Sequence, residues 1–181
     1  MLFKNYFAEW ISPIRLTKGT FLFHQHNASS SLFFIETGLV KAFYETRDGK
    51  EFIKSFISEG QIIGSLRALI AREPNSFSAV ALENLLAWEI PIAKLQALAN
   101  TTAGIQQFMN DQILALAMKK ERREYELLCL SAEERYRLFC EREPSLSQRL
   151  SQADIAAYLG ITPVGLSRIH KRVFLSIDQA G

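Results

Sequence analysis

The residues best suited to binding chemistry cluster near the C-terminal end of the chain. Between Arg149 and Arg172 the basic residues outnumber a single acid, Asp154; they are Arg149, Arg168, Lys171 and Arg172. Lysine and arginine neutralise phosphates, and an arginine fork also pairs with two acceptors of guanine. The whole chain has 21 Lys+Arg against 19 Asp+Glu, a net charge of +2. A nucleic-acid site must therefore be a local patch, and this segment is the candidate.

Two short helices are predicted to position these side chains. The first is expected over residues 151–159, with Ser151 as its N-cap. Gly160 supplies a left-handed turn. Thr162 then caps a second helix over residues 163 to about 173, which has proline at its first position. This is the plan of a helix-turn-helix.

The second helix of such a motif enters the major groove of DNA by its N-terminal half. The apolar positions of the motif, which we expect to be buried, are Ile155, Ala156, Leu159, Ile161, Leu166 and Ile169. The candidate DNA-binding residues are Thr162, Val164, Ser167, Arg168, Lys171 and Arg172. We expect Arg168 to read guanine, Val164 to touch a thymine methyl, and Ser167 and Lys171 to contact phosphates. The alternative is a helical hairpin that completes a core and exposes a solvated basic face.

The first half of the chain has the pattern of antiparallel strands. From residue 20 to 90 short apolar bursts alternate with turn residues. Asp48-Gly49, between residues 40–44 and 51–53, predicts a hairpin. We therefore expect an all-β domain from about Leu16 to Ile90.

A long helix is predicted over about residues 102–128. One apolar face carries Ile105, Phe108, Met109, Ile113 and Leu116, and a second carries Leu114, Ala117 and Met118. A helix packed on one domain needs one such stripe, so the second favours a homodimer. The alternative is a helix held between the β domain and the C-terminal helices of the same chain. A capping box, Ser131-Ala-Glu-Glu134, then starts another helix, which residues 144–147 are expected to break.

Cysteine content and the N-terminal residues bear on localisation. Cys129 and Cys140 are too few for a disulfide scaffold, a four-thiolate metal site or an iron–sulfur sensor, and they favour a reducing compartment. Lys4 and Glu9 interrupt the apolar residues at the start of the chain, so neither a signal peptide nor a membrane span is expected. The expected localisation is cytoplasmic, without membrane association.

Several motifs together resemble a known family. They include Leu32-Phe-Phe-Ile-Glu-Thr-Gly-Leu-Val-Lys41, Gly60-Gln-Ile-Ile-Gly64, and Gln152-Ala-Asp-Ile-Ala-Ala-Tyr-Leu-Gly-Ile-Thr-Pro163. In this order they resemble the Crp/Fnr regulators. The resemblance implies an α+β chain with an N-terminal antiparallel β-roll of the jelly-roll, cyclic-nucleotide-binding type. A long dimerisation helix and a C-terminal winged-helix-like helix-turn-helix follow.

The resemblance also implies a division into domains and a set of partners. Residues 1–128 would form the roll with its dimerisation helix, and residues 131–181 the DNA-binding domain with a short or absent wing. The implied partners are double-stranded DNA with an inverted-repeat site, a second copy of the chain, and RNA polymerase.

The ligand pocket departs from the family pattern. A family member has a glutamate for the ribose and an arginine for the cyclic phosphate. Here the glutamate position is Ser65 and the arginine position is Asn75. The residues of this degenerate pocket are Gly64, Ser65, Leu66, Asn75 and Ser76. Burial of a phosphate without a cation carries a large desolvation cost. Lys120 and Glu121, at the helix position that would touch adenine, do not match either. Cyclic AMP is therefore not expected as a ligand, and no cofactor is assigned.

Two alternatives of other classes remain open. The first is a cupin-like metalloenzyme, suggested by His24-Gln-His26, but Glu36 is ten residues beyond His26 and the third histidine is His170. The second is a protein-binding roll with a vestigial DNA-binding domain. No nucleophile with a suitable base and no phosphate-binding glycine loop stands out, so we assign no catalytic or metal-binding residue.

Overall fold

The computed structural model describes residues 13–178, with side chains of the last helix described up to Val173. The chain splits into two compact units, one ending at Asp111 and the other beginning at Gln112. This boundary lies inside a long helix, whereas the domain division expected from the sequence follows that helix. The division into functional domains stays a prediction.

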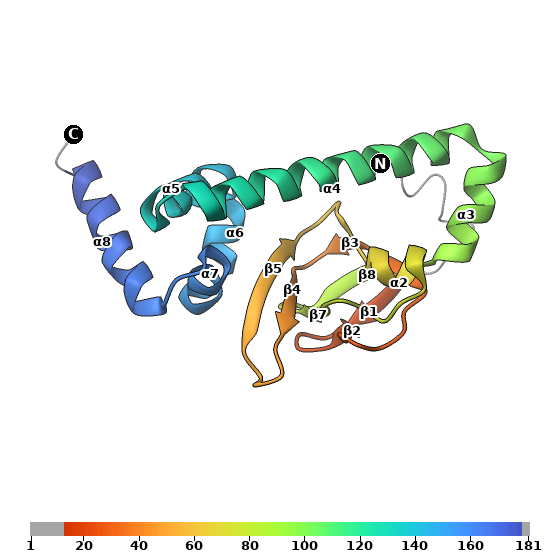
Figure 1. Cartoon of the computed structure of the whole chain (residues 1–181), viewed down its shortest axis with the longest axis horizontal. Helices are drawn as coiled ribbons and strands as arrows, with labels where there is room; N and C mark the ends of the chain where they lie inside the picture. The colour runs from red at the N-terminus through yellow and green to blue at the C-terminus, as the bar shows by residue number, and fades with distance from the viewer. Residues whose placement is uncertain (1–12, 179–181) are drawn as a thin grey trace. The chain divides into compact units, whose positions relative to one another are not determined.

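The first unit is built on two antiparallel four-stranded sheets, which carry the red-to-green strands of Figure 1. One sheet has the order β1-β8-β3-β6 and the other β2-β7-β4-β5. The strands are β1 Pro13–Leu16, β2 Phe21–Phe23, β3 Ser31–Thr37, β4 Val40–Glu45, β5 Glu51–Ile57, β6 Ile62–Ile63, β7 Ser78–Ala81 and β8 Leu85–Pro91. The predicted antiparallel roll is confirmed, with its first strand beginning at Pro13 and its last ending at Pro91.

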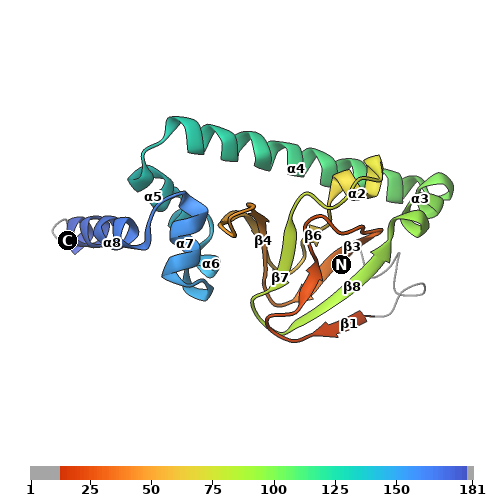
Figure 2. The ribbon, with the colours of Figure 1, turned by 60° about the horizontal axis from the view of Figure 1, so that its bottom comes forward.

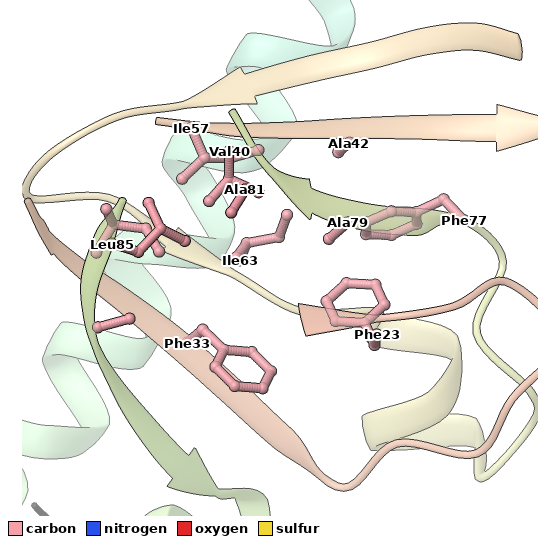
Figure 3. Close-up of a cluster of buried hydrophobic side chains, with 12 residues drawn as sticks. Phe23, Phe33, Val40, Ala42, Ile57, Ile63, Phe77, Ala79, Ala81 and Leu85 are labelled. Carbon is pink, nitrogen blue, oxygen red and sulfur yellow. The ribbon is translucent and has the colours of Figure 1, made fainter. Parts of the chain in front are cut away.

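Alternating side chains of the two sheets form the core between them. In β3 every second residue is buried, as a strand with one face toward a second sheet requires. Figure 3 shows Phe23, Phe33 and Phe77 among the aliphatic residues that fill this space. The Phe23 and Phe77 rings meet edge to face, with centroids 5.2 Å apart. This core fixes β6 and β7, the two strands that flank the segment carrying the predicted pocket residues.

The Asp48-Gly49 hairpin is confirmed between β4 and β5. Glu45 pairs with Glu51 at the open end of the turn. Inside it, the Thr46 amide donates to the Lys50 carbonyl oxygen at 3.0 Å. Gly49 has a φ of 78°, which a residue with a side chain rarely adopts. The turn thus needs glycine at this position.

Among the described residues, three helices accompany the sheets. They are α2 Leu66–Ala71, α3 Ile92–Thr101 and α4 Ala103–Cys129. The long helix predicted over about residues 102–128 is confirmed as α4, which Figure 1 shows as one continuous helix. Helix α3 was not predicted; its buried Leu95 packs in a cluster with Trp88, Ile90 and Ile105. The short apolar run after Pro91 did not reveal it, because its partners lie on β8 and α4.

The second unit contains the four C-terminal helices, drawn from teal to dark blue in Figure 2. They are α5 Ala132–Arg142, α6 Pro144–Arg149, α7 Gln152–Leu159 and α8 Pro163–Asp178. The capping box is confirmed, since the Ser131 hydroxyl accepts from the Glu134 amide and the Glu134 carboxylate accepts from the Ser131 amide. The predicted end of this helix before Pro144 is confirmed, since α5 ends at Arg142, but residues 144–147 are themselves helical. Pro144 instead begins α6, because the first helical position needs no amide donor.

The last helix is longer than expected. It runs past Val173 to Asp178, since residues 174–177 contain neither glycine nor proline. Residues 174–178, where a short wing was expected, belong to this helix, and residues 179–181 lie outside the described residues, as do Lys4 and Glu9. No helix in the described part of the chain is both long and apolar enough to cross a membrane.

Candidate nucleic-acid interface

The first helix of the predicted motif is fixed at both ends by local hydrogen bonds. At its start the Ser151 hydroxyl oxygen accepts from the Asp154 amide at 3.0 Å, which confirms Ser151 as the N-cap of α7. At its end Gly160 has a φ of 71°. The amides of Gly160 and Ile161 then reach back to the carbonyl oxygens of Ala157 and Ala156, at 3.2 and 3.0 Å. This Schellman arrangement fixes the direction in which the chain leaves α7.

The second helix begins at the predicted cap. The Thr162 hydroxyl oxygen accepts from the Gly165 amide at 3.1 Å, and the Thr162 carbonyl oxygen accepts from the Leu166 amide. Pro163 occupies the first helical position of α8. The Thr162 side chain, one of the predicted DNA-binding residues, is therefore engaged in the cap.

The apolar positions of the motif are buried as expected, with one exception. The fully or nearly buried residues are Ile155, Ala156, Leu159, Leu166 and Ile169, and Val173 joins them. Ile161, in the turn, is only half-buried. The expected interior of the helix-turn-helix is thus confirmed, apart from Ile161.

The opposite side of α8 is exposed and mostly polar. Its exposed predicted site residues are Val164, Ser167, Arg168, Lys171 and Arg172. They recur at three- and four-residue intervals, so they share one broad face of the helix. Val164, at the N-terminal end of this face, is 62% exposed. An exposed valine beside arginines is compatible with an apolar contact to a base edge.

Arg172 has an acidic neighbour on α5. Its guanidinium lies 3.6 Å from the Glu133 carboxylate, and the Arg172 side chain is 66% exposed. An exposed pair at this distance contributes little to stability. His170, which lies between the two faces of α8, is half-buried, and its ring centroid is 6.1 Å from that of Tyr136.

The predicted ligand-pocket residues of the roll have mostly structural contacts. Ser65 is buried before α2, and its hydroxyl oxygen accepts from the Ser76 amide at 3.4 Å. Gly64 lies against Leu32, where an added Cβ would come within 2.5 Å of a methyl group. Leu66 is instead 41% exposed. The structure therefore places these residues along one segment but does not direct all of them into one pocket.

Asn75, at the position where the family resemblance implies an arginine, holds a turn of the roll. Its side-chain amide donates to the His24 carbonyl oxygen at 3.0 Å. Its backbone amide donates to the Asn27 carbonyl oxygen, and its carbonyl oxygen accepts from the His26 amide, both at 2.9 Å. The Asn75 side chain is buried, and its Oδ1 has no hydrogen-bond partner among the described residues. This site offers a cyclic phosphate a neutral amide in place of a cation.

The two arginines near this segment, Arg67 and Arg72, are exposed at the surface. The Arg67 Nε donates to the Glu73 carboxylate at 2.8 Å. Arg72 ends α2 in a left-handed conformation, with a φ of 56°. The Arg67 charge is thus already paired with a carboxylate, and an anion in the roll would compete with Glu73 for it.

The residues weighed for a cupin-like metal site are engaged in other contacts. The His24 ring stacks on Phe21 at a centroid distance of 4.0 Å. The Glu36 carboxylate accepts from the indole nitrogen of Trp88 at 2.6 Å. His170 belongs to the second unit. Within residues 13–178, no group of three or more His, Cys, Asp or Glu side chains is arranged to hold a metal ion.

Comparison with known proteins agrees with this fold. The family model for the cyclic nucleotide-binding domain matches residues 13–102. The chain is 30% identical over 170 residues to the transcriptional activator protein Anr of Pseudomonas protegens, covering 87% of this chain and 68% of that protein. It is 30% identical over 167 residues to the fumarate and nitrate reduction regulatory protein of Escherichia coli, covering 85% of this chain and 65% of that protein. The chain thus spans about two thirds of the length of these relatives.

Solved structures show the same architecture at lower identity. FixK2 from Bradyrhizobium japonicum superposes with a TM-score of 0.81 at 17% identity, covering 92% of this chain and 85% of that one. A regulator of the Crp/Fnr family from Eubacterium rectale superposes with a TM-score of 0.72 at 15% identity, covering 96% of this chain and 82% of that one. A β-roll, a long helix and a helix-turn-helix define the class of regulator to which such proteins belong. The present chain is a member of the Crp/Fnr family of transcription regulators.

Proposed function

We propose that the chain is a homodimeric transcription regulator that binds an inverted-repeat DNA site through α8. The observation that carries this proposal is the exposed face of α8. It presents Arg168 and Lys171 to solvent on the side opposite the buried Leu166 and Ile169. In a helix-turn-helix, this is the face that enters the major groove.

The exposed apolar residues of α4 support the homodimer. Leu114, Met118, Tyr125 and Leu128 are each more than half exposed. At about 100° per residue they lie within about 40° of one line along the helix, in the spacing of a two-helix seam. An exposed apolar stripe of this length needs a partner surface. A second copy of α4 supplies a matching one, because a two-fold interface pairs a surface with itself.

The dimer sets the form of the DNA site. Two copies of α8 would enter successive major grooves about 34 Å apart, so the operator would be an inverted repeat. RNA polymerase is the further partner that the family suggests. The pocket residues of the roll do not favour cyclic AMP as the signal.

The decisive experiment is selection of bound sequences from a random pool of duplex DNA, followed by anisotropy titrations over a range of salt concentrations. We expect an inverted repeat to be enriched, with affinity that falls steeply as salt rises. If the protein is monomeric and binds no duplex DNA from the pool, the proposal is wrong. The protein-binding roll with a vestigial DNA-binding domain would then be favoured.

A further inference from the structure

The side of α4 opposite the apolar stripe is charged where it meets the C-terminal helices. Lys119, Arg123 and Glu126 are half-buried on this side. At about 100° per residue they lie roughly 120–180° around the helix from Leu114. The Glu126 carboxylate accepts from the Arg142 guanidinium of α5. Burial lowers the pKa of the Lys119 amine, and the nearby Glu143 carboxylate opposes this lowering.

Arg123 makes the most specific contact on this charged side. Its guanidinium donates to the carbonyl oxygen of Tyr158, in the last turn of α7. The same guanidinium lies over the Tyr158 ring, 3.8 Å from its centroid. The ring also lies 5.7 Å from that of Phe139 of α5. Tyr158 thus contacts both α4 and α5 at the end of α7; Figure 1 shows the course of these helices.

The contact completes the hydrogen bonding at the end of α7. A helix leaves its last four carbonyl oxygens without partners inside the helix. In α7 the carbonyls of Ala156 and Ala157 accept from the turn, as described above. The Tyr158 carbonyl accepts from Arg123, and the Leu159 carbonyl accepts from the Nε of Arg135 at 3.2 Å. Two arginines from other helices therefore fix the turn that leads into α8.

We propose that Arg123 is a positioning residue for DNA binding, which couples the dimer helix α4 to the direction of α8. The link between α7 and α8 is only Gly160, Ile161 and Thr162, so the last turn of α7 sets where α8 begins. In a dimer joined through α4, the spacing of the two recognition helices depends on how each α7 is held. This inference rests on the proposed function.

Arginine suits this role for physical reasons. Its planar guanidinium can donate to a carbonyl oxygen and stack on an aromatic ring at the same time. Arg123 also lies on the side of α4 away from Leu114 and Met118, so replacing it leaves the proposed dimer surface intact. Charged groups make the hydrogen bonds between this side of α4 and the C-terminal helices, and polar contacts allow more relative motion than a large apolar interface. The single contact of Arg123 with Tyr158 can therefore control how α7 is oriented on α4.

The test compares Arg123→Gln with Arg122→Gln in the full-length chain. Both variants lose one positive charge, and Arg122 is exposed. We expect Arg123→Gln to weaken binding to the selected DNA site by about tenfold, and Arg122→Gln to stay within about twofold of the parent. Sedimentation should show the same oligomeric state for all three proteins. Equal affinities of the two variants would overturn the proposal.

A distance measurement tests the same inference without DNA. Spin labels are placed on α4 and α8 through Lys120→Cys and Lys171→Cys, after Cys129 and Cys140 are replaced by serine, and labelled chains are diluted with unlabelled ones. We expect one narrow distance distribution in the parent and in Arg122→Gln, and a broadened or shifted one in Arg123→Gln. Unchanged distances between the two labels in Arg123→Gln would refute the proposal. If the parent binds no DNA but the distances respond, the positioning role stands and the proposed function fails.

A second variant guards against misfolding of Arg123→Gln. Tyr158→Leu removes the ring but leaves Arg123 in place, and we expect the same direction of change in affinity and distance. Because both substitutions act on one contact, the double variant should be little worse than either single one. Fully additive losses would show that the two residues act separately, which contradicts the proposal.

Discussion

Arg168 and Lys171 are one helical turn apart on the exposed face of α8, yet their side chains predict different effects on DNA binding. We expect Arg168→Ala to cost about 1–3 kcal/mol at the selected site and to relax the preference at one base pair, because a guanidinium fork pairs with guanine. Lys171→Ala should weaken binding to all DNA sequences alike. It should also reduce the slope of log affinity against log salt concentration by about one. Anisotropy titrations against single-base variants measure both. Unchanged affinity of Arg168→Ala for the selected site would refute its role in base reading.

Asn75 bears on the signal that the roll receives. Because its buried amide replaces a cation and already holds the His24 carbonyl oxygen, we expect no saturable heat when cyclic AMP is titrated into the protein. Isothermal calorimetry measures this directly. Micromolar binding that disappears in Ser76→Ala would contradict the prediction and restore the family's pocket.

The same asparagine predicts a stability effect. Asn75→Ala removes the hydrogen bond to His24 and leaves that carbonyl oxygen without this donor. We expect a loss of about 1–3 kcal/mol in the free energy of unfolding, measured in urea. Asn100→Ala, at an exposed position of α3, serves as the control and should change stability by about 0.5 kcal/mol or less. Equal stability of the two variants would mean that Asn75 does not hold the turn.

At the scale of the element, the start of α5 links sequence to pH dependence. Hydrogen bonds from the Ser131 hydroxyl and amide lower the pKa of the Glu134 carboxyl from its ordinary value near 4.5. A lowered pKa in the folded state means stability that is present above pH 4.5 and lost as the pH falls through the folded value. Ser131→Ala should cost about 1 kcal/mol at neutral pH. The gap between the two proteins should narrow in acid, as urea unfolding at pH 7 and at about pH 3 would show. A gap that is independent of pH would contradict the role of the capping box.

For the whole molecule, the apolar stripe of α4 predicts a dimer that depends on Met118. Met118→Glu would place like charges opposite each other in a two-fold seam, so we expect a monomer that has lost its preference for a full inverted repeat over a half-site. Gln112→Glu adds the same charge at an exposed position about 160° around the helix from Leu114 and should stay dimeric. Sedimentation velocity distinguishes them. A dimeric Met118→Glu protein would place the interface elsewhere.

Much of the fold and of the candidate interface was predictable from short-range patterns. The caps at Ser131, Ser151 and Thr162, the turn at Gly160 and the hairpin at Gly49 each depend on a few neighbouring residues. The buried and exposed faces of α8 follow from its helical period. The helices α3 and α6 were not predicted. Leu95 of α3 is buried by contacts with other elements, and Pro144 of α6 is equally compatible with a break and with a helix start.

The sequence by itself determined where the backbone turns, caps and repeats its apolar positions, because those choices are settled within a few residues. Only the tertiary structure decided which distant groups meet. Asn75 donates to a carbonyl 51 residues away, and Arg123 reaches one 35 residues away. Neither pairing leaves a mark in the local pattern, since a carbonyl oxygen is present at every residue. The partner is chosen by the packing that brings the two segments together.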